Sequence, residues 1–282
     1  MKVYLLWDME GASGLFTRDQ AWYWEPGVGP ETAEAGRRLL MADVDAASAA
    51  ALAAGADEVI VCDTHHGGGN IRPEALLPDP RITYHGRSTA TLADGTRRVF
   101  PGLDETVDGF LLPGHHAKAG TPDAFLPHTS SLAWLDFRIN GRSVGEIGLE
   151  ACYAGHWGVP LVFVQGDEAG CREAEAQFPG VVTAAVKRAE SADRCAGPDP
   201  AAARRLTADR VAETVARLRA GERPAPYAPA LPMTVSIRMA SAEDADRAAR
   251  RPTVRRVDEV TVEGVVERRC DVLKWLNGTG LD

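Results

Sequence analysis

An apolar run that ends on two acidic residues constrains the fold of this chain more than any other stretch. Val3 to Trp7 are almost wholly apolar, as in a strand that is buried on both faces of a mainly parallel sheet. Asp8 and Glu10 follow directly, in a turn that contains Gly11. Ligands of open α/β sheets bind outside the carboxyl ends of the strands. Two carboxylates that face the same point there need a cation, or one of them must hold a proton.

Three predicted strands end in loops that carry acidic residues or histidines. An alanine-rich helix at about 31–54 connects the first strand to a second at 58–62, which predicts a right-handed β-α-β unit with parallel strands. His65 and His66 follow the second strand. Further strands are expected at 82–85 and 109–112, and the latter leads into His115 and His116.

The rest of the chain continues the alternation of strands and helices. After residue 196 a proline-containing break and a helix lead to a proline-rich stretch, 221–232, and then to a small mixed tail. We therefore predict a three-layer α/β fold with a mainly parallel central sheet and helices on both faces, plus a C-terminal α+β lobe. Residues 1–282 would form a single catalytic chain, with a metal-binding core at about 1–196 and the lobe at about 197–282.

Composition excludes several classes of partner. The chain has 282 residues, 45% of them hydrophobic, so it can bury a large core. A net charge of −9 argues against a nucleic-acid partner. The five cysteines are scattered, which favours neither a disulfide framework nor a cysteine zinc site, and a reducing cytoplasm fits best. We expect no export signal, membrane span or membrane partner.

The candidate chemical residues are carboxylates and imidazoles without thiolates. Such ligands suit zinc, manganese or a similar divalent ion, and five of them with a shared carboxylate suit a two-metal site. A metal pair that activates water favours amide or ester hydrolysis. The candidates are Asp8, Glu10, His65, His116 and Glu146, with His66, His115 and His128 as neighbours.

Each candidate also has an ordinary structural interpretation. A lone histidine is more often structural than a ligand, although six of the seven histidines lie near three strand ends or in the loop after one of them. Ser143 and Glu146 have the spacing of a helix capping box, which would explain that glutamate without chemistry. We interpret His85 and His156 as structural, and Cys62 as a buried core cysteine rather than a nucleophile.

Several ordered blocks together resemble the zinc-dependent D-aminopeptidase family. The resemblance covers residues 1 to about 200 and continues more loosely to the end. Leu6 stands where the family signature has a serine. The blocks that carry the resemblance are Asp8-Met9-Glu10-Gly11, Asp63-Thr64-His65, Gly114-His115-His116-Ala117-Lys118-Ala119 with Thr121-Pro122, and Val144-Gly145-Glu146-Ile147-Gly148-Leu149.

The resemblance implies a specific site and assembly. Two zinc ions per chain would be bound with Asp8 as the bridge, and His128 would be the catalytic histidine. That residue is described in the family as a nucleophile, and we interpret it physically as a general base or proton donor. His128 matches through a loop that is one residue longer here. The family forms ring-like homo-oligomers. The implied zinc ligands are Asp8, Glu10, His65, His116 and Glu146.

Our preferred hypothesis is a cytoplasmic dizinc aminopeptidase that removes an N-terminal residue, D-alanine for example, from short peptides or amino-acid amides. A carboxylate near the metals would hold the free amine of the substrate. One alternative is an amidohydrolase that acts on another small amide or ester. Another is a non-catalytic, metal-dependent peptide-binding protein. A purely structural metal pair is disfavoured, because structural zinc usually prefers cysteine.

Overall fold

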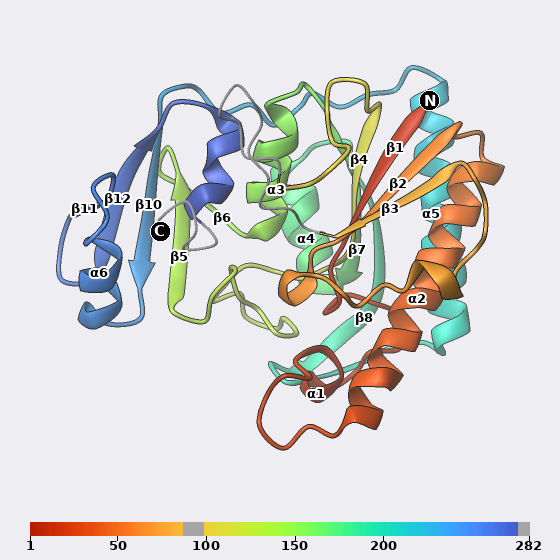
Figure 1. Cartoon of the computed structure of the whole chain (residues 1–282), viewed down its shortest axis with the longest axis horizontal. Coiled ribbons are helices and arrows are strands. Elements are labelled where there is room, and N and C mark those ends of the chain that lie inside the picture. The colour runs from red at the N-terminus through yellow and green to blue at the C-terminus, as the bar shows by residue number, and fades with distance from the viewer. Residues whose placement is uncertain (87–98, 276–282) are drawn as a thin grey trace.

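The computed structural model describes residues 1–86 and 99–275, and its centre is a mainly parallel sheet (Figure 1). Within the described residues this sheet has seven strands in the order β3-β2-β1-β4-β7-β8-β9, and all neighbours are parallel except the pair β8 and β9. The strands are β1 (Lys2–Trp7), β2 (Glu58–Asp63), β3 (Ile82–Gly86), β4 (Gly109–His115), β7 (Leu161–Asp167), β8 (Val182–Ser191) and β9 (Arg194–Ala196).

The central strand β1 buries side chains on both faces. Val3, Leu5 and Trp7 belong to one hydrophobic cluster, whereas Tyr4 and Leu6 belong to the other. All five residues are 0% exposed. A strand with neighbours on both edges and apolar layers on both faces cannot shift its register without exposing them, so the position at which β1 ends is fixed.

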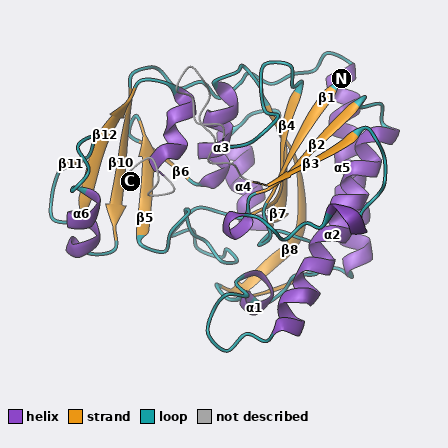
Figure 2. Ribbon diagram, in the orientation of Figure 1, coloured by secondary structure: helices purple, strands orange, loops and turns teal. Residues whose placement is uncertain are grey.

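Helices cover both faces of this sheet, as Figure 2 shows. On one face lie α2 (Pro30–Ala53) and α5 (Pro200–Arg219), which pack against each other. Both helices begin with a proline at the first turn, where its missing N–H costs nothing. On the other face lie α3 (Glu146–Gly155) and α4 (Glu168–Gln177). The predicted three-layer arrangement is therefore confirmed.

A second, antiparallel sheet packs beyond α3, with the strand order β11-β12-β10-β5-β6. Its strands are β5 (Trp134–Ile139), β6 (Arg142–Val144), β10 (Met233–Met239), β11 (Arg255–Arg256) and β12 (Thr261–Val266). The shorter elements are α1 (Arg18–Ala21), α6 (Ala242–Ala248) and the 3₁₀ turns η1 (His65–Gly67), η2 (Pro73–Ala75) and η3 (Arg269–Trp275).

The two sheets do not divide the chain at residue 196. β5 and β6 precede that residue and join the second sheet, while α5 follows it and packs against the first. The expected α+β character of the C-terminal part is present in β10, α6 and β12. The division of the chain into a core and a lobe stays a prediction.

The loops that follow β1 and β4 are joined backbone to backbone. The Asp8 N–H donates to the Pro113 carbonyl over 3.1 Å, and the Gly11 N–H donates to the Gly114 carbonyl over 2.6 Å. Gly114 has a φ of +79°, and a Cβ built on it would lie 2.0 Å from the Asp8 carbonyl oxygen. Only glycine permits that approach. The residues after these two strands are thereby held at a fixed separation.

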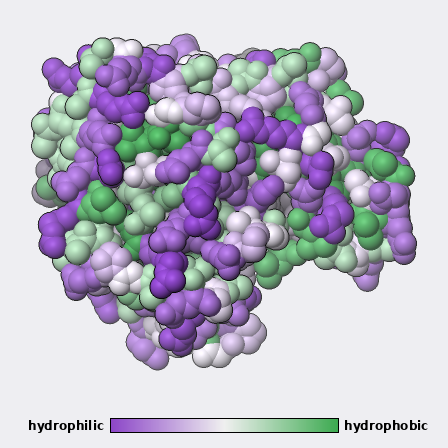
Figure 3. Space-filling view, turned by 180° about the vertical axis from the view of Figure 1, so that it is seen from behind, coloured by the Kyte–Doolittle hydropathy of each residue, from purple (hydrophilic) through white to green (hydrophobic). Residues whose placement is uncertain are grey.

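Polar residues cover most of the face that Figure 3 shows, with smaller apolar patches between them. No helix in the described segments is both long and apolar enough to cross a bilayer.

Candidate metal centre

Six side chains converge at the carboxyl ends of β1, β2 and β4. They come from five places in the chain, which only the parallel sheet and the packing of α3 bring together. Their positions are as follows: Asp8 and Glu10 follow β1, His65 follows β2, His116 follows β4, His128 lies between β4 and β5, and Glu146 is the first residue of α3. The sequence analysis named five of them as candidate ligands, and the family resemblance implied His128 as the catalytic histidine.

Asp8 lies between two groups of possible ligands. Its Oδ1 is 2.7 Å from His65 Nδ1, and its Oδ2 is 3.6 Å from His116 Nε2. Glu10 Oε2 is 3.2 Å from the same nitrogen of His65, and Glu146 Oε1 is 3.4 Å from the same nitrogen of His116. The two resulting triads, Asp8-Glu10-His65 and Asp8-His116-Glu146, each have ligand atoms within 4.8 Å of one another.

In His65 and His116, one ring nitrogen faces the carboxylates and the other makes a hydrogen bond outside the site. That outer hydrogen bond fixes which nitrogen carries the proton in the neutral ring. Because a carbonyl oxygen only accepts, His65 Nε2 must donate to Ala21 O (2.9 Å) and His116 Nδ1 must donate to Ala117 O (3.0 Å). The near nitrogens of the neutral rings therefore present lone pairs to the carboxylates. Metal-binding histidines usually show this arrangement, because the outer hydrogen bond fixes the tautomer and the ring orientation.

Two buried polar atoms at the centre indicate that a cation fits there. Glu10 Oε2 and His116 Nε2 are buried and have no hydrogen-bond partner among the described residues. Burial of polar atoms without a partner is costly, so such atoms are expected to meet a ligand or an ion. Oxygen and imidazole donors without a thiolate are within the usual ligand range of zinc. The residues present therefore fit the metal.

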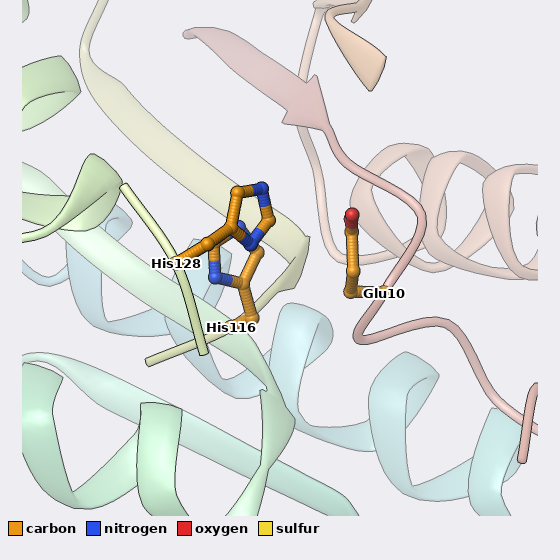
Figure 4. Close-up of side chains that lie close together, drawn as sticks. All are labelled: Glu10, His116 and His128. Atoms are coloured by element: carbon orange, nitrogen blue, oxygen red, sulfur yellow. The ribbon is translucent and has the colours of Figure 1, made fainter. Parts of the chain in front are cut away.

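His128 stacks on His116 and faces Glu10 across the site (Figure 4). The two imidazole centroids are 4.0 Å apart at an interplanar angle of 11°. His128 Nδ1 donates to Leu126 O over 2.9 Å, so Nε2 is the acceptor nitrogen of the neutral ring, 3.5 Å from Glu146 Oε1. This nitrogen is available to exchange a proton within the site.

Electrostatics couple the carboxylates to the imidazoles. Burial opposes the charge of Glu10, but the facing His65 lowers the pKa of this carboxyl well below its usual value. Burial also opposes the charge of His65, yet Glu10 and Asp8 raise the pKa of its imidazole well above the usual value. The pKa of His116 is raised in the same way by Glu146. Protons on the imidazoles thus balance the carboxylates where no metal does so.

Neighbouring groups orient the carboxylates, and the sequence did not single these groups out. The Trp22 indole N–H donates to Glu10 Oε1 over 2.7 Å, and the Ser130 N–H donates to Glu146 Oε1 over 2.7 Å. Hydrogen bonds of this kind hold a ligating carboxylate in one rotamer. Nothing in the local sequence around the tryptophan indicates a partner, and a backbone donor gives no signal in the sequence.

His115 belongs to neither triad and pairs with Glu150. Its Nε2 lies 2.6 Å from Glu150 Oε2, while its Nδ1 donates to Pro113 O over 3.1 Å. Both side chains are buried. Burial raises the pKa of the Glu150 carboxyl, although the facing His115 opposes that shift. The sequence analysis missed Glu150, although its position four residues after Glu146 is the spacing of one helix face and could have indicated it.

A cavity of about 150 Å³ opens over the centre. Trp24 and His66 form part of its wall, with their rings stacked 3.9 Å apart. The side chains that line it are those of Asp8, Glu10, Trp24, Thr64, His65, His66, Phe100, His128, Ser130, Glu146 and Glu150.

The capping-box interpretation of Glu146 is wrong. The N-cap of α3 is Gly145, with no side-chain cap, and Ser143 lies in β6. The Ser143 hydroxyl instead donates to Asp136 over 2.6 Å and accepts from Lys118 Nζ over 2.6 Å. The hairpin of β5 and β6 engages the serine, so Glu146 is available to the site. His85 and His156 belong to none of the ligand groups found in residues 1–86 and 99–275.

Comparison with known proteins gives one consistent result. A family described as D-aminopeptidase matches residues 1–278. The D-aminopeptidase of Bacillus subtilis (strain 168) is 36% identical over 215 residues, which cover 75% of this chain and 73% of that protein. The structure titled "Zn-dependent D-aminopeptidase DppA from Bacillus subtilis, a self-compartmentalizing protease" superposes with a TM-score of 0.86 at 30% identity. That match covers 100% of this chain and 97% of the other.

Proposed function

This chain belongs to the zinc-dependent D-aminopeptidase family of metallopeptidases, and we propose that it binds two zinc ions and hydrolyses the N-terminal residue of short peptides or amides with metal-activated water. D-Alanine is the residue that we expect it to release. One observation carries the proposal above all: Asp8 directs one oxygen into each of two adjacent ligand triads.

The proposed ligand assignment follows from the lone pairs that face each other. Asp8, Glu10 and His65 would hold one ion, and Asp8, His116 and Glu146 the other. The contact of 2.7 Å between Asp8 Oδ1 and the lone-pair nitrogen of His65 brings two acceptors together, so a cation or a proton must lie between them. A bound zinc pair would supply Lewis acidity and lower the pKa of a water molecule.

His128 is proposed as the group that carries the proton. Its acceptor nitrogen lies at the cavity and beside Glu146, where it can take a proton from the attacking water and return it to the leaving amine. The hydrogen bond to Leu126 holds the ring in the required tautomer. A site that only bound peptides would gain nothing from an imidazole in this position.

The size of the cavity supports a small substrate residue. A volume of about 150 Å³ is well below the roughly 300–1,000 Å³ of typical small-molecule pockets. The stacked rings of Trp24 and His66 narrow the space on one side. A methyl side chain fits such a site better than a large one, which favours alanine over aromatic residues.

We also propose that the chain assembles with copies of itself in the cytoplasm. The structural relative is titled a self-compartmentalizing protease, and it matches this chain over its full length. A closed homo-oligomer would restrict access to short peptides. A mass of one chain by light scattering would contradict this assembly.

Hydrolysis of a matched panel of substrates tests the proposal. The purified, zinc-loaded protein is assayed with amides and dipeptides of D- and L-alanine, with alanine esters, and with N-acetylated forms that lack a free amine. We expect D-alanyl amides to be cleaved fastest, activity to disappear on chelation, and zinc to restore it. Activity that survives exhaustive chelation would refute the metal mechanism, and faster cleavage of substrates without a free amine would indicate a different hydrolase.

A further inference from the structure

The cavity contains one carboxylate that belongs to neither ligand triad. Glu150 lines the cavity, and it lies on α3 one turn beyond Glu146. Residues four apart on a helix share a face, with about 5–6 Å between their Cβ atoms. Glu150 therefore stands beside the candidate metal centre without being part of it.

His115 holds this carboxylate in one orientation. The imidazole is anchored by its N–H bond to the Pro113 carbonyl, at the end of β4. Its Nε2 contacts Glu150 Oε2 over 2.6 Å, so that oxygen is engaged. The second oxygen, Oε1, is the one left to contact a molecule in the cavity. Because both partners are buried, Glu150 has little freedom to turn away.

A substrate with a protonated amine would be stabilised by one more anionic side chain near the proposed metal pair. Two divalent ions bring four positive charges, whereas Asp8, Glu10 and Glu146 supply three negative ones. A substrate ammonium would enter a site with surplus positive charge, which disfavours it in a buried environment. The amine is also two bonds from the carbonyl carbon that is attacked. A group that binds it should therefore lie close to the metal ligands and have an oxygen that is not committed to a metal ion.

We propose that Glu150 recognises the free α-amino group of the substrate, with His115 as the residue that positions it. This inference rests on the proposed aminopeptidase function and names the residue that would make the enzyme specific for N-termini. In the same position, Glu150 would reject substrates whose amine is blocked or absent.

Glu150→Gln removes the charge and keeps the shape. In the wild type Nδ1 donates to Pro113 O, so the contact of 2.6 Å between Nε2 and the Glu150 carboxylate requires a proton on Nε2 as well. In the variant the ring can be neutral, and its Nε2 lone pair can accept from the glutamine amide N–H. Glu173→Gln is the matched control. Glu173 is a half-buried carboxylate beside the site, bonded to the Lys118 N–H over 2.8 Å, but it does not line the cavity.

The experiment measures binding rather than turnover. Calorimetric titration compares D-alanine with propionate, which lacks the amine, on the zinc-loaded wild type and both variants. The wild type should bind D-alanine more tightly than propionate by roughly tenfold to a hundredfold. Glu150→Gln should reduce this ratio to about one while its affinity for propionate stays unchanged. Glu173→Gln should keep the wild-type ratio.

Three results would overturn the inference: a wild type that does not prefer D-alanine, a Glu150→Gln variant that keeps the preference, or one that loses affinity for both ligands equally. Zinc content and thermal unfolding are measured on each variant to establish that it is folded and loaded. The hydrolysis panel on the wild type tests the proposed function separately. If the wild type is active but Glu150→Gln keeps the wild-type ratio of affinities for D-alanine and propionate, only the role of Glu150 is contradicted.

Discussion

The two nitrogens of each site histidine have separate tasks. In His65, His116 and His128 the outer nitrogen donates to a main-chain carbonyl, and the inner nitrogen faces a carboxylate. The proposed chemistry depends on this division, because a protonated inner nitrogen can neither bind a metal nor accept a proton. The carbonyls belong to Ala21 at the end of α1 and to Ala117 and Leu126 in the connection between β4 and β5, so the fold sets all three tautomers.

Replacing His128 by alanine should separate catalysis from metal binding. We expect turnover to fall by about a hundredfold to ten-thousandfold, the usual contribution of a general acid or base, while both zinc ions remain bound. His156→Ala, which alters a histidine at the end of α3, is the control and should retain normal turnover. Steady-state kinetics with zinc analysis gives the answer. Near wild-type turnover in His128→Ala would remove the residue from the mechanism.

Sequence reasoning predicted the side chains that the fold brings together at the candidate metal centre, but not those that orient them. Asp8 and His65 follow apolar strands directly, so their positions could be predicted from the end of each strand. Trp22 and Glu150 act through contacts across the fold, with Glu10 and His115 respectively. Such contacts depend on how a loop folds back or how a helix packs. The spacing of Glu150 from Glu146 indicates a shared helix face, but nothing in the sequence indicates the contact with His115.

An irregularity in β8 directs a lysine toward the site. The pairing of β7 with β8 shifts by one residue between Gly166 and Asp167, and Val186 and Lys187 are consequently both buried. Bulges of this kind redirect a side chain. Lys187 Nζ donates to the carbonyls of Glu10 and Leu15, each over 2.6 Å, and so holds the loop that carries two of the candidate ligands.

Lys187→Met should loosen that loop. Two buried carbonyls would lose their donor, which we expect to lower the free energy of unfolding by about 2 kcal/mol and to weaken zinc binding at the triad that includes Glu10. Urea unfolding and zinc titration measure the two effects. Lys2→Met removes a lysine at the surface, and its unfolding free energy should change by less than about 0.5 kcal/mol. Unchanged zinc affinity in Lys187→Met would argue against this role.

The elements themselves were more predictable than their ends. The buried apolar runs of β1 and β2 and the small, helix-forming residues of α2 determine those elements locally, and they were predicted close to their observed bounds. The start of α3 was not, because the tertiary contacts of Ser143 with Asp136 and Lys118 override its local tendency to cap a helix. Pairing of β5 with β10 joins segments about a hundred residues apart, which local patterns do not reveal.

At the scale of the whole molecule, the site brings together segments that are far apart in the sequence. Residues from β1 to α3 meet only in the folded protein, so the unfolded chain offers no comparable site. A ligand that binds only the folded state stabilises it in proportion to the logarithm of its concentration over its dissociation constant. Zinc should therefore raise the melting temperature of the whole molecule.

This stabilisation should grow with pH. In the metal-free protein the pKa values of His65 and His116 are raised, so protonation of these rings stabilises the fold. This stabilisation is fully present below a pH of about 6.5, the ordinary pKa of histidine. It is lost as the pH rises through the raised pKa values. Zinc must displace the same protons, so it binds more tightly as the pH rises. The difference in melting temperature between zinc-loaded and chelated protein should be larger at pH 8 than at pH 6. An equal difference at both values would contradict this linkage.

The zinc content of each folded chain tests most directly whether Asp8 is shared by two bound ions. Elemental analysis of zinc-loaded, dialysed protein should give about two ions in the wild type, about one in Glu146→Ala, and fewer than one in Asp8→Ala, because Asp8 serves both triads. A wild type that retains only one ion, or an Asp8→Ala variant that retains two, would contradict the account.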